Sequence, residues 1–316
     1  MSDTSDTSDT SDTNEAGKPG VAEESGTITL TERGVVIEGQ RVASAMSDGA
    51  RGLLAHAPLV VLPDAGARWS DYRVIMERFA TSRRVFALDW PGFGASARPA
   101  PEEFAYMLDH LALVFGQWLD SLGVARAVLL GHGLAAGVVT RYAVAHPLRT
   151  LGMALVGPLG FTPAPPSMEK LAGRALRSPR LLRLAEPTLT SLTLGPTTEQ
   201  TRAIEAQRRA ARKLSDYATT LAATVALWRD ADATRAQAMA LARQTRAPGL
   251  VIRGALDPLC TAAEARLVAE ALGERGGLEV TLPEAGHLPH LQQPERFYQA
   301  LEGLILTAEA NMATAN

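Results

Sequence analysis

The stretch Val128-Leu129-Leu130-Gly131-His132-Gly133-Leu134-Ala135-Ala136-Gly137 decides how the rest of the chain is interpreted. Its first three residues are apolar, which is typical of a buried parallel strand. Small residues then crowd a turn, and a helical pattern runs from Leu134 to Ala145. Such a turn needs a residue that tolerates positive φ and neighbours that let strand and helix approach closely. The stretch therefore predicts a strand, a sharp turn centred on Gly133 and a packed helix.

The same order of strand, turn and helix repeats along the chain. Apolar runs predict strands, and helical spacing predicts the segments that follow them. The predicted strands are Leu59–Leu62, Arg84–Leu88, Ala127–Leu130 and 151–156, and the predicted helices are Trp69–Ala80, Pro101–Leu122 and 134–145. Strands alternating with helices predict an α/β protein with a mostly parallel, doubly wound sheet, here of eight strands.

A helical insertion interrupts this repetition. Residues 158–246 contain no strand-like run but keep helical apolar spacing, as in Leu171, Ala175 and Leu176. Strand patterns resume at 250–252 and 278–282, and a last helix is predicted from Pro294 to Leu306. We therefore predict a core of residues 26–157 and 247–310, with an inserted helical lid of residues 158–246 over the carboxyl edge of the sheet.

The beginning of the chain has a different character. Ser-Asp-Thr repeats and other polar residues fill positions 1–25, so we expect a disordered tail there. Alternating residues from Thr27 to Thr31, then 35–37 and 42–43, favour short antiparallel strands at the edge of the sheet.

Composition limits the kind of partner. The 316 residues include 31 basic and 34 acidic side chains, so the net charge of −3 favours a small-molecule partner over nucleic acid or an anionic membrane surface. The single Cys260 excludes an intrachain disulfide, and no residue set has the spacing of zinc ligands. We expect no metal, no cofactor, no membrane span and a cytoplasmic location. The oligomeric state stays open.

Four motifs in order resemble the α/β-hydrolase superfamily, in its lid-bearing lyase, esterase and epoxide hydrolase branch. The turn at Gly133 is similar to its nucleophile elbow, and 89–96 (DWPGFGAS) to its D-x-P-G-x-G-x-S loop. Gly254-Ala255-Leu256-Asp257-Pro258 is similar to its acid loop and Gly286-His287 to its histidine loop. The resemblance covers residues 27 to about 306 and implies an α/β-hydrolase fold.

The resemblance fails at the nucleophile. The family pattern is GxSxG, but Gly133 stands in place of the serine and Ala135 in place of the second glycine. Glycine has no side chain with which to attack a carbonyl, although it tolerates the backbone of the elbow. The resemblance therefore implies a degenerate nucleophile elbow and a protein that is not an ordinary serine hydrolase.

A second departure lies beside the first. The family's His-Gly oxyanion loop aligns with Pro63-Asp64-Ala65-Gly66, so the amides of Ala65 and Leu134 would form the oxyanion hole. Asp64 would place beside this hole a carboxylate that opposes an oxyanion. Two departures around one centre favour natural divergence over an engineered serine-to-glycine change, which would leave Asp64 unexplained; the engineered origin stays the alternative.

Asp257 and His287 occupy the family's acid and base positions. An Asp that orients a His fixes its tautomer and supports the imidazolium that forms when it accepts a proton. One interpretation is a working general base that deprotonates the substrate or a water in the space left by the serine side chain. The other is that inheritance of the fold alone preserved the pair. Hydrolysis, elimination, cyclisation and cofactor-free oxygen chemistry are all compatible with the first.

Several other residues have competing interpretations. Cys260 and Ser96 are candidate substitute nucleophiles, but a packing role and a turn-capping role are favoured for them. His132 is expected to make a structural hydrogen bond, and His290 to lie at the surface or at a helix start. Trp69 is either a pocket residue or a buried aromatic at a helix start. The basic run Arg208, Arg209, Arg212 and Lys213 is expected to be a solvated helix face.

Three functions remain in competition. The first is a non-serine hydrolase or lyase that uses the Asp257–His287 dyad as general base on a mostly apolar small molecule. The second is a pseudoenzyme whose pocket binds a small ligand or a partner without catalysis. The third, weaker one is a structural or regulatory protein that acts through its N-terminal tail.

Overall fold

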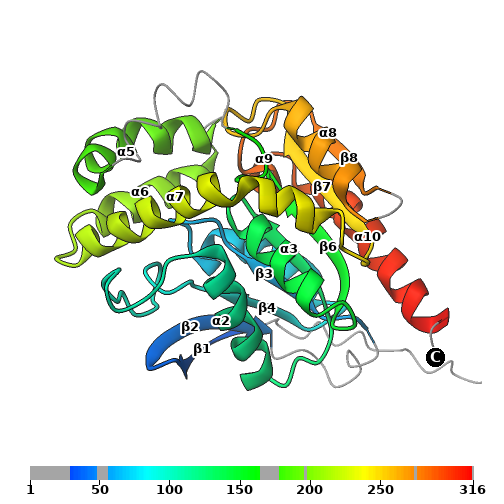
Figure 1. Cartoon of the computed structure of the whole chain (residues 1–316). Helices are drawn as coiled ribbons and strands as arrows, with labels where there is room; N and C mark the ends of the chain where they lie inside the picture. The colour runs from blue at the N-terminus through cyan, green and yellow to red at the C-terminus, as the bar shows by residue number, and fades with distance from the viewer. Residues whose placement is uncertain (1–28, 48–55, 164–177, 196–197, 274–275, 315–316) are drawn as a thin grey trace, which may run out of the picture.

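The computed structural model describes residues 29–47, 56–163, 178–195, 198–273 and 276–314 (Figure 1). The predicted tail of residues 1–25 lies outside this range, as do Leu171, Ala175 and Leu176 of the predicted helical insertion. The described residues form one sheet with helices on both of its faces.

Eight strands form the sheet, and its topology confirms the predicted fold class. Their order across the sheet is β1-β2-β4-β3-β5-β6-β7-β8. Strands β1 and β2 are antiparallel to each other, β2 is antiparallel to β4, and all later pairs are parallel. The strands are β1 (Leu30–Ile37), β2 (Gln40–Ser47), β3 (Leu59–Leu62), β4 (Val85–Leu88), β5 (Ala127–His132), β6 (Thr150–Val156), β7 (Gly249–Gly254) and β8 (Leu278–Leu282).

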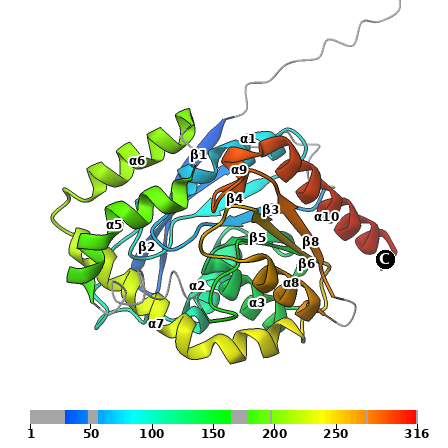
Figure 2. The same ribbon diagram turned by 90° about the horizontal axis from the view of Figure 1, so that it is seen from above.

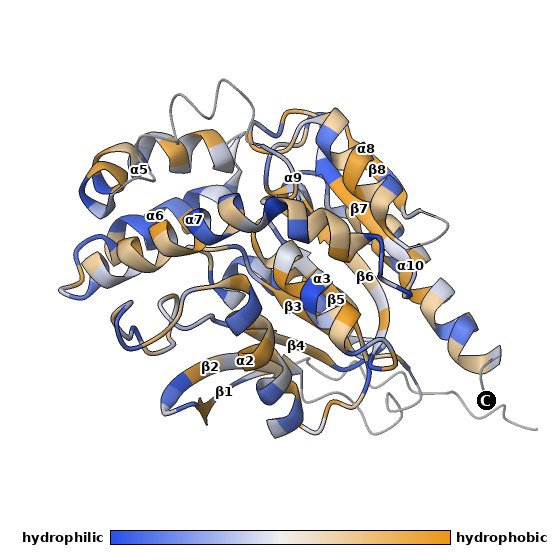
Figure 3. Cartoon of the chain, in the orientation of Figure 1, coloured by the Kyte–Doolittle hydropathy of each residue, from blue (hydrophilic) through white to orange (hydrophobic). Residues whose placement is uncertain are grey.

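The central strands are buried on both faces, which explains their unbroken apolar runs. In β3, Val60 and Leu62 pack into one hydrophobic core and Leu59 and Val61 into the other, and the central strands are mostly orange in Figure 3. The first core contains residues of α2 (Leu108–Ser121), α3 (Ala135–Ala145) and α8 (Ala262–Ala271). The second contains residues of α1 (Arg73–Ala80) and α10 (Pro294–Thr314) (Figure 2).

Among the described residues between β6 and β7 there are three helices, within the segment for which we predicted a helical insertion. They are α5 (Pro179–Leu194), α6 (Glu199–Ala211) and α7 (Tyr217–Ala242), and Figure 1 shows them grouped together. Helix α7 is joined to the core because Leu227, Ala231 and Ala238 are buried in the first hydrophobic cluster. Among the described residues, no helix combines the length and the apolar character that a membrane crossing requires.

The start of α2 differs from the prediction of a helix from Pro101. Residues 101–107 form turns and irregular backbone, in which Phe104 and Tyr106 are both buried. Side chains two positions apart do not share one face of a helix, so burying both favours a non-helical path. The helix begins instead at Leu108, whose backbone N–H donates to Asp230 Oδ2 of α7 at 2.8 Å.

Candidate active site

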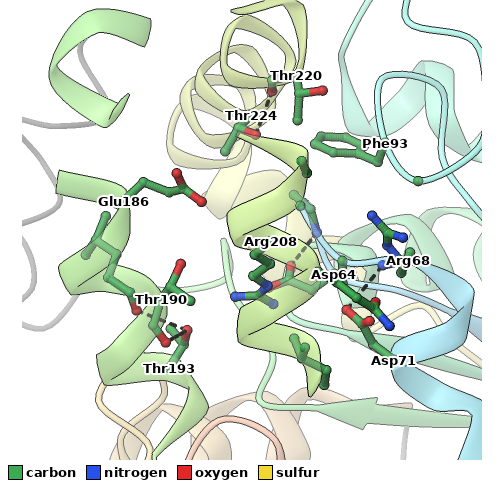
Figure 4. A pocket seen from close by; sticks show the side chains of 18 of the residues that line it. Asp64, Arg68, Asp71, Phe93, Glu186, Thr190, Thr193, Arg208, Thr220 and Thr224 are labelled. Carbon is green, nitrogen blue, oxygen red and sulfur yellow. Dashed lines mark hydrogen bonds between the residues drawn. The ribbon is translucent and has the colours of Figure 1, made fainter. Parts of the chain in front are cut away.

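A cavity of about 180 Å³ lies where the carboxyl ends of the strands meet the helices α5, α6 and α7. The loops after β3, β4, β7 and β8 and the end of β5 contribute to its wall, together with side chains of the three helices (Figure 4). Apolar residues cover much of the wall, including Phe93, Leu182, Leu189, Leu221, Trp228 and Leu288. Asp64 and His287 lie at the base, and the helices contribute further polar side chains, including Glu186, Thr190 and Arg208.

The turn between β5 and α3 is centred on Gly133, as predicted. Gly133 has φ of +56°, a left-handed conformation that glycine adopts without steric cost. Its N–H donates to Val156 O at 2.9 Å, and its carbonyl accepts from Leu159 N–H at 3.1 Å. Backbone hydrogen bonds on both sides therefore hold the turn in place.

The carboxylate of Asp64 occupies the predicted oxyanion hole. Asp64 Oδ1 accepts hydrogen bonds from the amides of Ala65 and Leu134, each at 2.8 Å. A Cβ atom built on Gly133 would overlap this carboxylate. We predicted that Asp64 would lie beside the hole and that water could fill the space of a missing serine side chain. The carboxylate instead fills both, so the prediction of a water in that space is wrong.

His287 lies between two carboxylates. Its Nδ1 donates to Asp257 Oδ2 at 2.9 Å, and its Nε2 lies 3.4 Å from Asp64 Oδ2. Asp257 is itself fixed, because its Oδ1 accepts from the amides of Leu259 at 2.8 Å and Cys260 at 3.3 Å. The structure thus brings Asp64, His287 and Asp257 together in one cluster. From the sequence, only Asp257 and His287 were expected to form a pair, and Asp64 was expected to oppose an oxyanion.

These contacts determine the charge of the imidazole. Burial lowers the pKa of His287, but the charges and hydrogen bonds of Asp257 and Asp64 outweigh burial and raise this pKa to about 10. Burial raises the pKa of Asp64 and of Asp257, while the hydrogen bonds and charge of His287 shift the balance and leave both pKa values lowered. At neutral pH the site therefore holds an imidazolium between two carboxylates.

A chain of buried hydrogen bonds supports the site from below. The Asp64 N–H donates to the Tyr72 hydroxyl at 3.1 Å, and that hydroxyl lies 2.6 Å from His132 Nδ1. His132 Nε2 lies 2.8 Å from the carbonyl of His287, which can only accept, so the Nε2–H tautomer donates and Nδ1 accepts from Tyr72. Burial and the charge of His287 lower the pKa of His132 to about 4, which keeps it neutral. The chain joins the backbones of Asp64 and His287.

The side chains of the other candidates from the sequence have structural roles. Ser96 donates to Asp89 O at 2.6 Å and accepts from Ala43 N–H at 2.8 Å, as a turn-capping residue does. Cys260 is buried, and burial raises the pKa of its thiol. Trp69 is buried in the second hydrophobic core and is not among the residues that line the cavity.

His290 corrects the expectation of a surface residue. It lies in the short helix α9 (Pro289–Gln292) but is fully buried, stacked on Tyr72 with 4.9 Å between ring centroids. Its Nε2 donates to Asp71 O at 3.2 Å, and burial lowers its pKa to about 3. A single helix-start position in the sequence gives no measure of burial, so this packing role could not be predicted.

Several charged residues of the cavity were also missed, Arg208 and Asp71 among them. Arg208 lines the cavity, although we expected the basic run to be a solvated helix face. Asp71, in the 3-10 helix η2 (Trp69–Tyr72), lines it as well, and its burial raises the pKa of its carboxyl. In the described part of the chain, no group of three or more His, Cys, Asp or Glu side chains is placed to hold a metal ion.

The class of protein follows from the strand order and from the cluster of Asp64, His287 and Asp257 at the carboxyl edge of the sheet. Comparison with known families identifies this class. Residues 53–300 match the alpha/beta hydrolase family. The chain belongs to this family, whose members are mostly hydrolases.

Individual curated relatives match either a short part of the chain or a longer part at lower sequence identity. The chain is 34% identical over 110 residues to a 2-hydroxymuconate semialdehyde hydrolase of Pseudomonas sp. strain CF600, which covers 33% of this chain and 38% of that protein. It is 28% identical over 251 residues to the dihydrolipoyllysine-residue acetyltransferase component of the acetoin cleaving system of Pseudomonas putida, covering 77% and 62%. The chain thus spans less than two thirds of the length of the first curated relatives that it matches.

Solved structures show the same fold at low sequence identity. A 2-hydroxy-6-oxo-6-phenylhexa-2,4-dienoate hydrolase from Rhodococcus sp. strain RHA1 superposes with a TM-score of 0.71 at 19% identity, covering 88% of this chain and 99% of that one. A haloalkane dehalogenase loop variant from Bradyrhizobium elkanii gives 0.71 at 21% identity, covering 92% and 100%.

Proposed function

We propose that this protein is a hydrolase in which the Asp64 carboxylate replaces the serine nucleophile, with His287 and Asp257 as its supporting pair. The substrate is a small molecule with a mostly apolar body and a leaving group on a saturated carbon. One observation carries the proposal: Asp64 Oδ1 is held by two backbone amides, while Oδ2 faces His287 at the base of the cavity.

The occupied oxyanion hole argues against ordinary ester hydrolysis. A substrate carbonyl needs free N–H donors for the negative charge that develops on its oxygen. The amides of Ala65 and Leu134 already donate to Asp64. Displacement at a saturated carbon places no such demand on the hole, because the charge develops on the leaving group.

The first step forms an ester. Asp64 Oδ2 attacks the substrate carbon, an O–C bond forms, and the bond to the leaving group breaks with its electron pair. Oδ1 becomes the carbonyl oxygen of the aspartyl ester and stays against the amides of Ala65 and Leu134. The site thus stabilises a carbonyl that belongs to the enzyme itself.

The second step hydrolyses that ester. Esterification removes the charge of Asp64, one of the two carboxylates that hold the His287 pKa at about 10. The imidazolium then releases its proton to solvent or to the leaving group, and neutral His287 takes a proton from a water that attacks Asp64 Cγ. The oxyanion on Oδ1 accepts from the two amides. As this intermediate collapses, His287 gives its proton to the departing alcohol oxygen, and the proton left on the Asp64 carboxyl passes to His287, which restores the carboxylate and the imidazolium.

Labelled water tests the covalent step. The chain is incubated with 1-bromoalkanes and terminal epoxides in H₂¹⁸O, then digested by trypsin in ordinary water. Cleavage after Arg51, Arg68 and Arg73 separates Asp64, the only acid in residues 52–68, from Asp71 in residues 69–73. We expect ¹⁸O in the Asp64 peptide and none in the Asp71 peptide, which serves as the internal control. Label in the product alone would overturn Asp64 as the nucleophile.

A trapped intermediate gives a second readout. In His287→Gln the ester forms but is not hydrolysed, so the intact protein should gain the mass of one alkyl group. Asp64→Asn should gain none.

The second candidate is a pseudoenzyme, which one observation favours. Both carboxylates, the imidazolium and both hole amides already have partners within the protein, so the cluster is satisfied without a substrate. Absence of both the ¹⁸O label and the alkyl adduct across the halide and epoxide panel would favour this function.

A further inference from the structure

One face of helix α6 is turned to the cavity. Ile204, Gln207, Arg208 and Ala211 all line it, and their spacing of three and four residues is that of one helical face. Arg208 is the basic residue of this face. In Figure 4 its side chain lies in the cavity on the same side as Asp64.

Three neighbouring cations already have acidic partners. Arg209 pairs with Glu205 at 2.9 Å on the outer surface of α6, and Arg212 pairs with Glu186 at 2.7 Å. Across the cavity, Arg98 lies 3.2 Å from Asp216. The basic run therefore does not form one solvated face: Arg209 faces solvent, whereas Arg208 faces the cavity.

Arg208 has no such partner among the described residues. Its Nε is buried and has no hydrogen-bond acceptor. The charge of Arg208 acts on Asp71: burial raises the pKa of the Asp71 carboxyl, and the charges of Arg208 and Arg68 oppose that rise. No ion pair of 4.0 Å or less joins Asp71 to Arg208 among the described residues. A buried guanidinium N–H without an acceptor is costly unless a ligand supplies one.

We infer that Arg208 binds an oxyanion group of the substrate, a carboxylate or a phosphate monoester, on a part of the molecule other than the carbon that reacts with Asp64. The guanidinium fork matches two oxygens of either group. Leu182, Leu189, Leu221 and Trp228 line the cavity as well and suit an apolar chain attached to the anion. The inference rests on the proposed function only for the position of the reacting carbon.

Calorimetric titration with unreactive ligands tests the anion site without any turnover. The probes are n-alkyl carboxylates from butanoate to octanoate, the matching alkyl phosphates, and the matching primary amides as neutral controls. We expect the full-length protein to bind one anion series at least about 10-fold more tightly than the amides. Loss of one charge-assisted hydrogen bond in Arg208→Gln should weaken that series by about 10- to 100-fold and change amide binding little.

Arg209→Gln is the matched control, because Arg209 is the adjacent cation on the same helix but pairs outward with Glu205. It should bind the anions as the unchanged protein does, and both variants should keep the circular dichroism of the fold. Equal affinity for anions and amides, failure to bind any probe, or equal weakening by both variants would overturn the anion site. Anion binding without ¹⁸O in Asp64 would sink the proposed reaction and leave this site standing.

Discussion

Asp64 and His287 face each other across 3.4 Å, between Asp64 Oδ2 and His287 Nε2, although they come from loops after β3 and β8 that lie far apart in the sequence. Asp257 contacts the other side of the ring. An imidazole with a carboxylate at each nitrogen is stabilised as a cation. This relationship determines how the protein should respond to pH.

The free energy of unfolding should fall as pH rises through the alkaline range. The pKa of His287 is raised from 6.5 to about 10 in the folded chain, so its contribution is complete below pH 6.5 and is lost as pH rises through 10. Denaturant titrations between pH 6 and 10.5 should show this fall. His287→Gln should abolish that part of the slope, and Asp64→Asn should move it to lower pH.

The same cluster predicts a loss of stability in acid. Asp64 and Asp257 have lowered pKa values, so their contribution to the free energy of unfolding is present above pH 3.8 and is lost as pH falls through their folded pKa values.

Nuclear magnetic resonance of the His287 ring gives a direct check of the cluster, since the ring should titrate well above pH 6.5 in the unchanged protein. A ring that titrates near 6.5 would contradict the three-residue cluster.

Tyr72→Phe should destabilise the chain by roughly 1–3 kcal/mol, because it leaves His132 Nδ1 without a donor and the Asp64 N–H without an acceptor. Tyr142→Phe is the matched control, since the buried Tyr142 hydroxyl has no hydrogen-bond partner among the described residues. That change should be neutral or stabilising. Urea titrations of both variants measure the difference, and equal losses would refute the role given to the buried chain of hydrogen bonds.

Gly133→Ser should destabilise the chain by roughly 3 kcal/mol or more, because the new side chain displaces the Asp64 carboxylate from its partners. Gly123→Ala separates the effect of overlap from that of backbone strain. Gly123 has φ of +65°, and no described atom lies within 4 Å of the position that an added Cβ would take, so this change should cost about 1–2 kcal/mol from strain alone. Asp64→Gly combined with Gly133→Ser should be more stable than the sum of the single changes, by a double-mutant cycle.

A fluorophosphonate probe should not label the unchanged protein, because Gly133 offers no hydroxyl beside His287. Gly133→Ser alone should stay unlabelled, since the displaced Asp64 carboxylate still leaves a negative charge beside the two amides, which opposes an oxyanion. The combined change, Asp64→Gly with Gly133→Ser, frees these amides and should gain labelling together with hydrolysis of short aryl esters. Labelling of the unchanged chain would overturn the assignment of Gly133.

The fold was largely predictable because its signals are local. Buried parallel strands read as apolar runs, and the small residues around Gly133 predicted the turn between β5 and α3. Helix α2 was extended too far toward Pro101, since the burial of Phe104 and Tyr106 depends on distant contacts. Helix α8 was overlooked, although the capping box of Thr261 and Glu264 marks its start.

The site was less predictable because its chemistry depends on where side chains meet. The alignment placed Asp64 near the amides of Ala65 and Leu134, but only the structure shows its carboxylate accepting from both. The inward direction of Arg208 depends on the rotation of α6 about its axis. A polar helix sequence does not fix that rotation.

The overlap between a side chain at position 133 and the carboxylate at position 64 restricts the order in which such a pair can arise by single substitutions. A lineage with a side chain at 133 must lose it before an aspartate at 64 can settle on the amides. Once the aspartate is there, recovering a hydroxyl at 133 by one substitution meets an occupied space. A substitution at either position is therefore tolerated only when the residue at the other position leaves room for it.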